Sequence, residues 1–378
     1  MKAIELAKAY APKEFEDRIY ESWESAGHFK PAGESGKKPF VIVIPPPNVT
    51  GVLHMGHGLN NSLQDIAIRY NRMLGRPTLW VPGSDHAGIA TQHVVEKKLR
   101  AQGILRRDLG REKFVEETWK VANEHHDIIK KQLEKIGSSC DWTRERFTLD
   151  EGLSKAVREV FVTLYERGLV YKGEYLVNWC PSCGTALADD EVDHADEAGG
   201  MFHIRYEILD PPAGAPPEGG WTVIGGKAFI EIATTRPETL LGDTAVAAHP
   251  EDPRYAALIG KKVKLPLTDR TIPIIADSYV DRAFGTGLVK ITPAHDPNDF
   301  EVGNRHSLER VNVLTPDGRL SDAAPAKYRG MTVKEARKAV VADLQASGLF
   351  VREEKISHSV GHCYRCHTVV EPYLSEQW

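Results

Sequence analysis

Two histidines separated by two residues carry the first chemical signal in the sequence. They lie in the segment PPPNVTGVLHMGH, residues 45–57. An apolar run precedes this segment and a helical pattern follows it, so we expect His54 and His57 to share one face of a helix N-terminus. Exposed backbone N–H groups and the helix dipole favour phosphate at such a place. Imidazoles there can donate to phosphate oxygens and stabilise charge that develops on an α-phosphate. Gly56 between them allows a ligand to approach the backbone closely.

Short elements of alternating type must position these histidines. Residues 40–44 (FVIVI) form a continuously apolar, β-branched run, which is typical of a buried parallel strand. Helical spacing follows over 54–74, where Leu59, Leu63, Ile66 and Tyr70 recur on one side. A second strand is expected at 78–81 and a second helix at 87–100. This order predicts an α/β fold that contains the first half of a doubly wound, Rossmann-like parallel sheet, whose ligands bind beyond the carboxyl ends of the strands.

Four of the five cysteines form two C-x-x-C pairs, Cys180 with Cys183 and Cys363 with Cys366, and Cys140 stands alone. In a chain without an export signal, such pairs indicate a metal before they indicate disulfides. Four thiolates suit tetrahedral Zn²⁺. A redox role is the alternative, disfavoured because neither pair opens a helix after a thioredoxin-like strand. Histidines near the pairs are possible substitute ligands: His194, His362 and His367.

The pattern of residue types changes near residue 196. Short β-rich runs at 228–233, 271–276, 287–291 and 311–314 are separated by turn residues, and one helix is expected over 332–347. The second cysteine pair arrives only after this region, so the region reads as a β-rich domain inserted into the first one. The predicted division is a helical arm and linker (1–39), half of the Rossmann-like domain with the first cysteine pair (40–195), the inserted domain (196–347) and a return segment with the second pair (348–378).

Composition narrows the class of protein further. The chain has 378 residues, 48 Lys+Arg and 53 Asp+Glu, for a net charge of −5, and 41% of its residues are hydrophobic. These values are typical of a globular protein. No apolar run approaches the roughly 18 residues of a membrane helix, and the N-terminus lacks the apolar core of a signal peptide. We therefore expect a cytoplasmic protein without a membrane partner. Basic residues between 97 and 113 leave a local RNA contact open.

The histidine segment resembles the HIGH signature of class I aminoacyl-tRNA synthetases. Its form PPPNVTG-x-LHMGH, and the segment WVPGSDHAGIATQ at 80–92, are more similar to the valine-specific branch than to the isoleucine- or leucine-specific branches. The resemblance runs nearly end to end. It implies valine, ATP with Mg²⁺, and tRNA(Val) as substrates, together with a structural Zn²⁺ on the four cysteines. We expect the protein to be monomeric.

The resemblance also assigns roles near the histidines. His54 and His57 would be catalytic, because in this family they stabilise the adenylation transition state. Asp85 would pair with the substrate's α-ammonium, as a fixed carboxylate does well, and Pro45 and Asn48 would shape a pocket for a small branched side chain. From the residues alone, Asp85 reads equally well as the N-cap of the helix at 87. The ATP-binding set implied is Asn48, Thr50, His54, Gly56 and His57.

Two further motifs lie in the inserted region, TTRPET at 234–239 and the stretch 284–299. Each alone is an ordinary strand end or Asp/Asn turn. Together they resemble an editing pocket that hydrolyses mischarged threonyl-tRNA. Asp299 would hold the α-ammonium, and Thr292 and Asp296 would recognise the threonine hydroxyl. The remaining residues of this set, of which the first three would bind the terminal adenosine and orient water, are Arg236, Thr239, Lys290 and Phe284.

There is a physical reason to expect a second, editing site. An apolar pocket rejects an isosteric hydroxyl analogue by only about 10², and a valine-specific synthetase facing threonine is the established example of this limit. A separate pocket that hydrogen-bonds the hydroxyl can use the difference that the first pocket cannot. No nucleophilic Cys or Ser stands out in the editing motifs, so a positioned water is the expected nucleophile.

The chain departs from the family at one signature. The lysine motif KMSKS is absent, and the faint likeness at 355–359 (KISHS) lies inside the returning cysteine segment. We therefore expect an N-terminal fragment, under half of such an enzyme and inactive in aminoacylation on its own. Three alternatives stay open: an isoleucine-type synthetase fragment, a freestanding aminoacyl-tRNA deacylase, and a non-catalytic zinc-containing RNA-binding piece.

Overall fold

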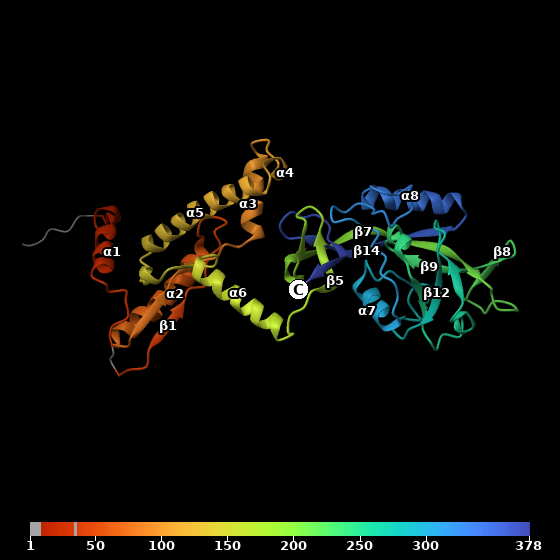
Figure 1. Cartoon of the computed structure of the whole chain (residues 1–378), viewed down its shortest axis with the longest axis horizontal. Coiled ribbons are helices and arrows are strands. Elements are labelled where there is room, and N and C mark those ends of the chain that lie inside the picture. Colours follow the sequence, from red (N-terminus) through yellow and green to blue (C-terminus); the bar gives the residue numbers. More distant parts are fainter. Residues whose placement is uncertain (1–8, 34–35) are drawn as a thin grey trace, which may run out of the picture. The chain divides into compact units, whose positions relative to one another are not determined.

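The computed structural model describes residues 9–33 and 36–378. The chain forms two compact units, of which the first ends at Val170 and the second begins at Tyr171. Figure 1 traces the chain. Part of the arm and linker predicted over 1–39 lies outside the described residues. The four-part division of the chain stays a prediction. Within the described ranges, no helix combines the length and the apolar character needed to cross a membrane.

The first unit is built on short parallel strands. Strand β1 (Phe40–Val43) pairs in parallel with β2 (Thr78–Val81), and helix α2 (Met55–Met73) connects them. This confirms the predicted strand–helix–strand order. After Pro82 the chain continues into β3 (Gly83–Ser84), which pairs in parallel with β4 (Arg146–Phe147). The other helices of this unit are α1 (Glu16–Ser25), α3 (Ile89–Arg100), α4 (Arg106–Leu109), α5 (Arg111–Lys135) and α6 (Glu151–Glu166), drawn in Figure 1.

Helix α2 packs on the sheet through a different face from the one its apolar spacing suggests. Ile68 is fully buried in the core cluster that contains Trp80. The apolar residues that recur at helical spacing, among them Leu59, Leu63 and Ile66, are 59–65% exposed. The periodicity therefore predicts the helix correctly, but the apolar stripe is not the face that covers β1 and β2.

The second unit contains a mixed sheet with the strand order β13-β10-β12-β11-β7-β9-β8. Strand β14 (Phe350–Cys363) pairs antiparallel with β7 (Val192–Leu209) down to Cys363 and Val192. These two long strands carry the chain into and out of this sheet. Helix α8 (Val333–Ala346), which Figure 1 labels, contributes Val340 and Leu344 to the core. The remaining strands of the sheet are β8 (Thr222–Ile224), β9 (Lys227–Thr234), β10 (Ala245–Ala248), β11 (Lys262–Lys264), β12 (Thr271–Ala276) and β13 (Leu288–Ile291).

A smaller sheet in the same unit, in the order β15-β5-β6, carries the cysteine loops. Strand β5 (Gly173–Cys180) pairs antiparallel with β6 (Thr185–Leu187) and with β15 (Glu371–Gln377). Cys180 thus ends one strand of the sheet, and Cys363 ends β14, the strand that returns from the larger sheet. The two cysteine pairs therefore come to the same place although 180 positions separate them in sequence.

The prediction of a strand at 311–314 is wrong. The backbone N–H of Val313 donates to Nε2 of His295 at 2.9 Å, and its carbonyl accepts from the N–H of Ser321 at 2.8 Å. Leu314 forms only an isolated bridge with Leu320. The backbone groups of this apolar run are satisfied by a side chain and by a turn, so they do not need a neighbouring strand.

Candidate functional site

Asp85 lies between two other chain segments beyond the carboxyl ends of the strands. Its N–H donates to the carbonyl of Pro47 at 2.8 Å, and its carbonyl accepts from the N–H of Val49 at 2.9 Å. These bonds form a parallel bridge with Asn48. The residues predicted to bind the amino acid, Asn48 and Asp85, are thus held next to each other, and Pro45 precedes the bridge. The N-cap of α3 is Gly88, so the reading of Asp85 as that cap is wrong.

The two histidines form the N-terminus of α2. His54 is the N-cap, and its Nδ1 accepts from the N–H of Gly56 at 3.1 Å. Nδ1 of His57 accepts from the N–H of His54 at 3.2 Å, and the ring centroids lie 3.9 Å apart. A neutral imidazole that accepts through Nδ1 carries its proton on Nε2. Both rings therefore offer an Nε2–H donor. A Cβ on Gly56 would lie 3.0 Å from the His54 ring, so glycine gives this arrangement its room.

The surroundings of His57 favour its neutral form. Partial burial, with a smaller effect of His54, lowers the pKa of His57 below its ordinary value of 6.5. This shift favours the neutral form of His57. A neutral imidazole whose Nδ1 already accepts a hydrogen bond can donate its Nε2–H to a phosphate oxygen. Thr50, the other predicted ATP ligand, lies in the loop that joins the Asn48 bridge to this helix.

A second polar cluster lies in the core of the larger sheet. Nζ of Lys290 lies 3.2 Å from both Thr239 Oγ1 and Asp243 Oδ1, and it also contacts Thr292 Oγ1. Thr292 donates its hydroxyl to Asp243 at 2.6 Å and its backbone N–H to Asp299 Oδ2 at 2.8 Å. All five residues are buried. The structure thus brings together Thr239, Lys290, Thr292 and Asp299, which the sequence predicts to form one pocket.

Arg236 is held by groups of the protein itself. Its guanidinium lies 3.4 Å from the carboxylate of Glu238, contacts Glu371, and donates to the carbonyl of His295 at 3.2 Å. Glu238 is fully buried and also accepts from Arg337 at 2.8 and 2.9 Å. These arginines hold the pKa of Glu238 below its ordinary value although burial raises it. The guanidinium of Arg236 therefore anchors the 3₁₀ turn at Pro237–Gly242.

The last two predicted editing residues lie at the edges of this region. Oδ1 of Asp296 accepts from the N–H groups of Asn298 and Asp299 at 2.8 and 3.1 Å, so Asp296 is the N-cap of α7 (Pro297–His306). This cap places Asp299 in the first turn of the helix. Phe284 is 69% exposed on the turn between β12 and β13, outside the hydrogen-bonded cluster.

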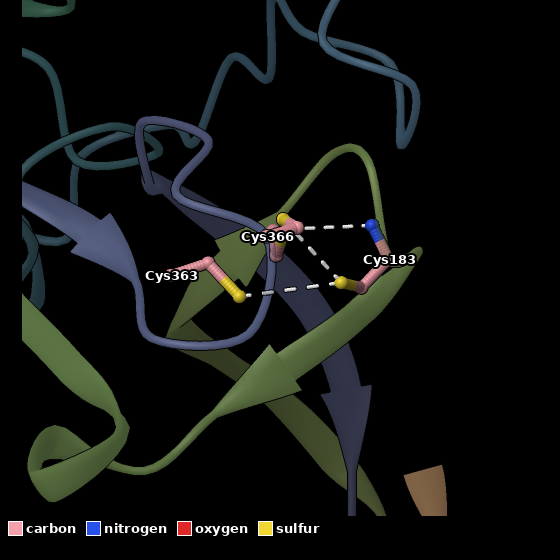
Figure 2. Close-up of side chains that lie close together, drawn as sticks. Cys183, Cys363 and Cys366 are labelled. Atoms are coloured by element: carbon pink, nitrogen blue, oxygen red, sulfur yellow. Dashed lines mark hydrogen bonds between the residues drawn. The ribbon is translucent and has the colours of Figure 1, made fainter. Parts of the chain in front are cut away.

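The four sulfur atoms of the cysteine pairs lie within 4.8 Å of one another. Figure 2 shows side chains from the two loops converging. Sγ of Cys366 lies 3.4 Å from Cys180 and 3.6 Å from Cys183, and Cys183 lies 4.0 Å from Cys363. Sulfur atoms around a tetrahedral Zn²⁺, with Zn–S bonds of about 2.3 Å, are about 3.7 Å apart. Burial raises the pKa of Cys180 to about 11. A bound cation would offset this cost of burying thiolates.

Comparison with known proteins decides the family. Residues 18–378 match the family described as tRNA synthetases class I (I, L, M and V). The chain belongs to this family. It is 65% identical to the valine–tRNA ligase of Treponema denticola and 56% identical to that of Treponema pallidum, over 100% of this chain in both cases. The valine–tRNA ligase of Geobacter sulfurreducens is 57% identical over 99% of this chain.

This class I synthetase chain spans about two fifths of the length of these relatives, with shares of 41%, 42% and 40%. Among solved structures, the LeuRS-tRNA-LeuAMS ternary complex of Agrobacterium radiobacter K84 is 18% identical. That match covers 96% of this chain and 52% of the solved one, with a TM-score of 0.42.

Sequence reasoning about this synthetase chain misses Asp243, the acceptor at the centre of the buried cluster. Oδ2 of Asp243 accepts from the hydroxyl of Tyr206 at 2.8 Å, and Oδ1 accepts from Thr292 and lies beside Lys290. Burial raises the pKa of Asp243, and Lys290 opposes that rise. A signal was available, because Asp243 is the one charged residue in the otherwise apolar run LLGDTAVAA at 240–248. A carboxylate in such a run needs a partner.

We predict that the burial of Asp299 makes stability depend on pH. Burial raises the pKa of Asp299 to about 7, so between about pH 4 and 7 the folded state keeps a proton that the unfolded chain has released. The stability that this retained proton gives to the folded state falls as the pH rises through that window. Asp299→Asn lacks the titration, so its unfolding free energy relative to wild type should rise by about 1.4 kcal/mol per pH unit there and level off above pH 7.

Urea unfolding at a series of pH values measures this difference. Asp269→Asn, at an exposed carboxyl of the same unit, is the matched control and should show a constant difference. A constant difference for Asp299→Asn as well would contradict the prediction.

Proposed function

We propose that the chain is the N-terminal part of a valine–tRNA ligase. The whole protein would act as a cytoplasmic monomer that activates valine with ATP and attaches it to tRNA(Val). Two observations beyond the parallel strands support this proposal most directly. Asp85 is paired with Asn48, and His54 and His57 form the start of α2. Relatives that are 52–65% identical over nearly the whole chain carry the valine name, which favours valine over the isoleucine alternative. Without the KMSKS lysines, we expect this chain alone to be inactive in aminoacylation.

In the proposed activation step, Asp85 accepts the α-ammonium of valine, and Pro45 and Asn48 shape the wall beside its side chain. The valine carboxylate then attacks the α-phosphate of ATP. A carboxylate oxygen–phosphorus bond forms, the bond to the β-phosphate oxygen breaks, and pyrophosphate leaves. Nε2–H groups of His54 and His57 donate to the α-phosphate oxygens as charge develops there. Mg²⁺ that arrives with ATP neutralises charge on the other phosphates.

We propose that the buried cluster of the second unit is an editing site that hydrolyses threonyl-tRNA. Asp299 would receive the α-ammonium of threonine, and a cation beside it favours its ionised form. Thr292 and Asp296 would recognise the hydroxyl that valine lacks. Lys290 and Thr239 would bind the terminal adenosine and orient the attacking water, with Phe284 at the rim. Arg236, already paired with carboxylates, would hold the turn that presents Thr239.

We propose a structural Zn²⁺ on Cys180, Cys183, Cys363 and Cys366. The sulfur distances and the buried donor set fit this ion. Zinc would join the loop between β5 and β6 to the loop between β14 and β15. This link would fix the two ends of the inserted segment, which we place at residues 196–347.

The activation proposal is tested with the full-length gene product in valine-dependent ATP–pyrophosphate exchange. His57→Ala should lower kcat by about 10²- to 10³-fold, because it removes one preorganised donor to the developing charge. His28→Ala, at an exposed histidine of the first unit, is the control and should keep wild-type exchange. Unchanged exchange in His57→Ala, or preferential activation of isoleucine by the wild type, would refute the proposal.

The editing proposal is tested with the 378-residue chain and pre-made aminoacyl-tRNA. It should release threonine from threonyl-tRNA(Val) and leave valyl-tRNA(Val) largely intact. Lys290→Met should slow this release by about 10²-fold or more, because it removes a cation from the site. Lys264→Met, at an exposed lysine of β11, is the control, and thermal unfolding shows whether each variant is folded. A folded wild-type chain that releases no threonine would exclude the proposal.

The zinc proposal predicts about one Zn²⁺ per chain after purification without chelators, measured by mass spectrometry of the metal. The double variant Cys363→Ser/Cys366→Ser should lose the ion and unfold at lower temperature, because two ligands on one loop are gone. Cys140→Ala, at a buried cysteine outside the cluster, should retain it. Metal-free wild type, or full zinc in the double variant, is the result that would disprove this assignment.

A further inference from the structure

We propose that Thr148 is a positioning residue that orients Asp85 for the substrate ammonium, an inference that rests on the proposed activation of valine. The hydroxyl of Thr148 lies 2.9 Å from Oδ1 of Asp85. The same oxygen lies 2.5 Å from Nδ1 of His86, and it accepts from the backbone N–H of His86 at 2.9 Å. One hydroxyl thus contacts the carboxylate of Asp85 together with the backbone N–H and the Nδ1 atom of His86.

The backbone fixes Thr148 at this place. Its N–H donates to the carbonyl of Ser84 at 3.2 Å, directly after the parallel pairing of β3 with β4. The two strands approach so closely that a Cβ on Gly83 would lie 2.8 Å from the carbonyl oxygen of Arg146. On its other side the backbone of Asp85 is hydrogen-bonded to Pro47 and Val49, which flank Asn48. Its backbone is therefore held from one side and its carboxylate from the other.

Proton accounting gives the hydroxyl a single orientation. A threonine hydroxyl has one proton and two lone pairs. The backbone N–H of His86 takes one lone pair, and the carboxylate of Asp85 is the stronger acceptor within reach, so the proton lies toward Asp85. Nδ1 of His86 must then carry a proton and donate to the remaining lone pair. The rotation of the hydroxyl and the tautomer of His86 are fixed together.

This arrangement decides which oxygen of Asp85 is available. Oδ1 accepts from Thr148 and from the N–H of Ala87 at 3.2 Å. Among the described residues, no hydrogen bond reaches Oδ2, and the Asp85 side chain is 35% exposed. Nδ1 of His86 lies 3.3 Å from Oδ1, so without the hydroxyl it would pair with the carboxylate directly. Thr148 and the N–H of Ala87 therefore hold Oδ1 in place, and this leaves Oδ2 for the ammonium.

The test uses valine-dependent pyrophosphate exchange by the full-length gene product. Thr148→Val should raise the KM for valine about 10- to 100-fold, the loss expected when a hydrogen bond to a charged group is removed. The KM for ATP and kcat should stay within about threefold, and Thr148→Ser, which restores the hydroxyl, should recover most of the lost affinity. Thr143→Val is the matched control, because Thr143 donates to Asp141 at 2.6 Å in the same unit and does not contact Asp85.

Two competitive inhibitors separate positioning from a general structural effect. Valinol keeps the ammonium and should bind Thr148→Val more weakly in proportion to valine. Isovalerate lacks the ammonium, so its inhibition constant should not change. Equal losses for both inhibitors, or a KM for valine that stays at the wild-type value in an active enzyme, would overturn the inference. A wild type that exchanges no pyrophosphate with valine would instead refute the proposed function, so the two failures are distinguishable.

Discussion

Backbone hydrogen bonds on the Asn48 side of Asp85, together with the parallel pairing of β3 and β4, are the constraint on which the first site depends. They place three segments that are distant in sequence beside one carboxylate. Each bond contributes only about 1 kcal/mol net. Their value lies in geometry, because proximity and orientation lower a barrier only when the groups are held before the reaction. Backbone pairing therefore holds Asn48 and Asp85 beside each other, while the other proposed ligands, His54, Gly56 and His57, lie at the start of α2.

The polar cluster of the second unit is under a different constraint, because its groups are buried. Lys290 is neutralised by Asp243, and the hydroxyls of Thr239 and Thr292 complete its hydrogen bonds. Such a cluster is costly to bury unless every member has a partner. Burial raises the pKa of Asp299 to about 7, although Lys290 and the backbone N–H of Thr292 oppose that rise. An ammonium beside Asp299 would favour the ionised form of this carboxyl, which is the interaction that the proposed editing site would use.

The sequence predicts the local helices and strands of this protein better than it predicts which residues pack against each other. Strands 78–81 and 271–276 form where expected, because short β-branched runs between turn residues have few alternatives. The partner that buries a stripe is a tertiary fact, so Leu63 and Ile66 predict a helix without predicting their exposure. The cysteines were predictable as a cluster from their repeated spacing. Thr148 carried no local signal, because its meaning depends on contact with Asp85, 63 positions earlier.

The two carboxylates proposed to receive an α-ammonium differ in environment, and the difference matches their tasks. Asp85 is 35% exposed and bound by a hydroxyl and a backbone N–H, so a small free amino acid would reach it from water. Asp299 is buried at the first turn of α7, and burial raises its pKa to about 7. Binding an ammonium there below pH 7 releases a proton, so that affinity falls as the medium becomes more acidic. Proofreading would therefore weaken with acidity even where the donor geometry of the His54–His57 pair is unchanged.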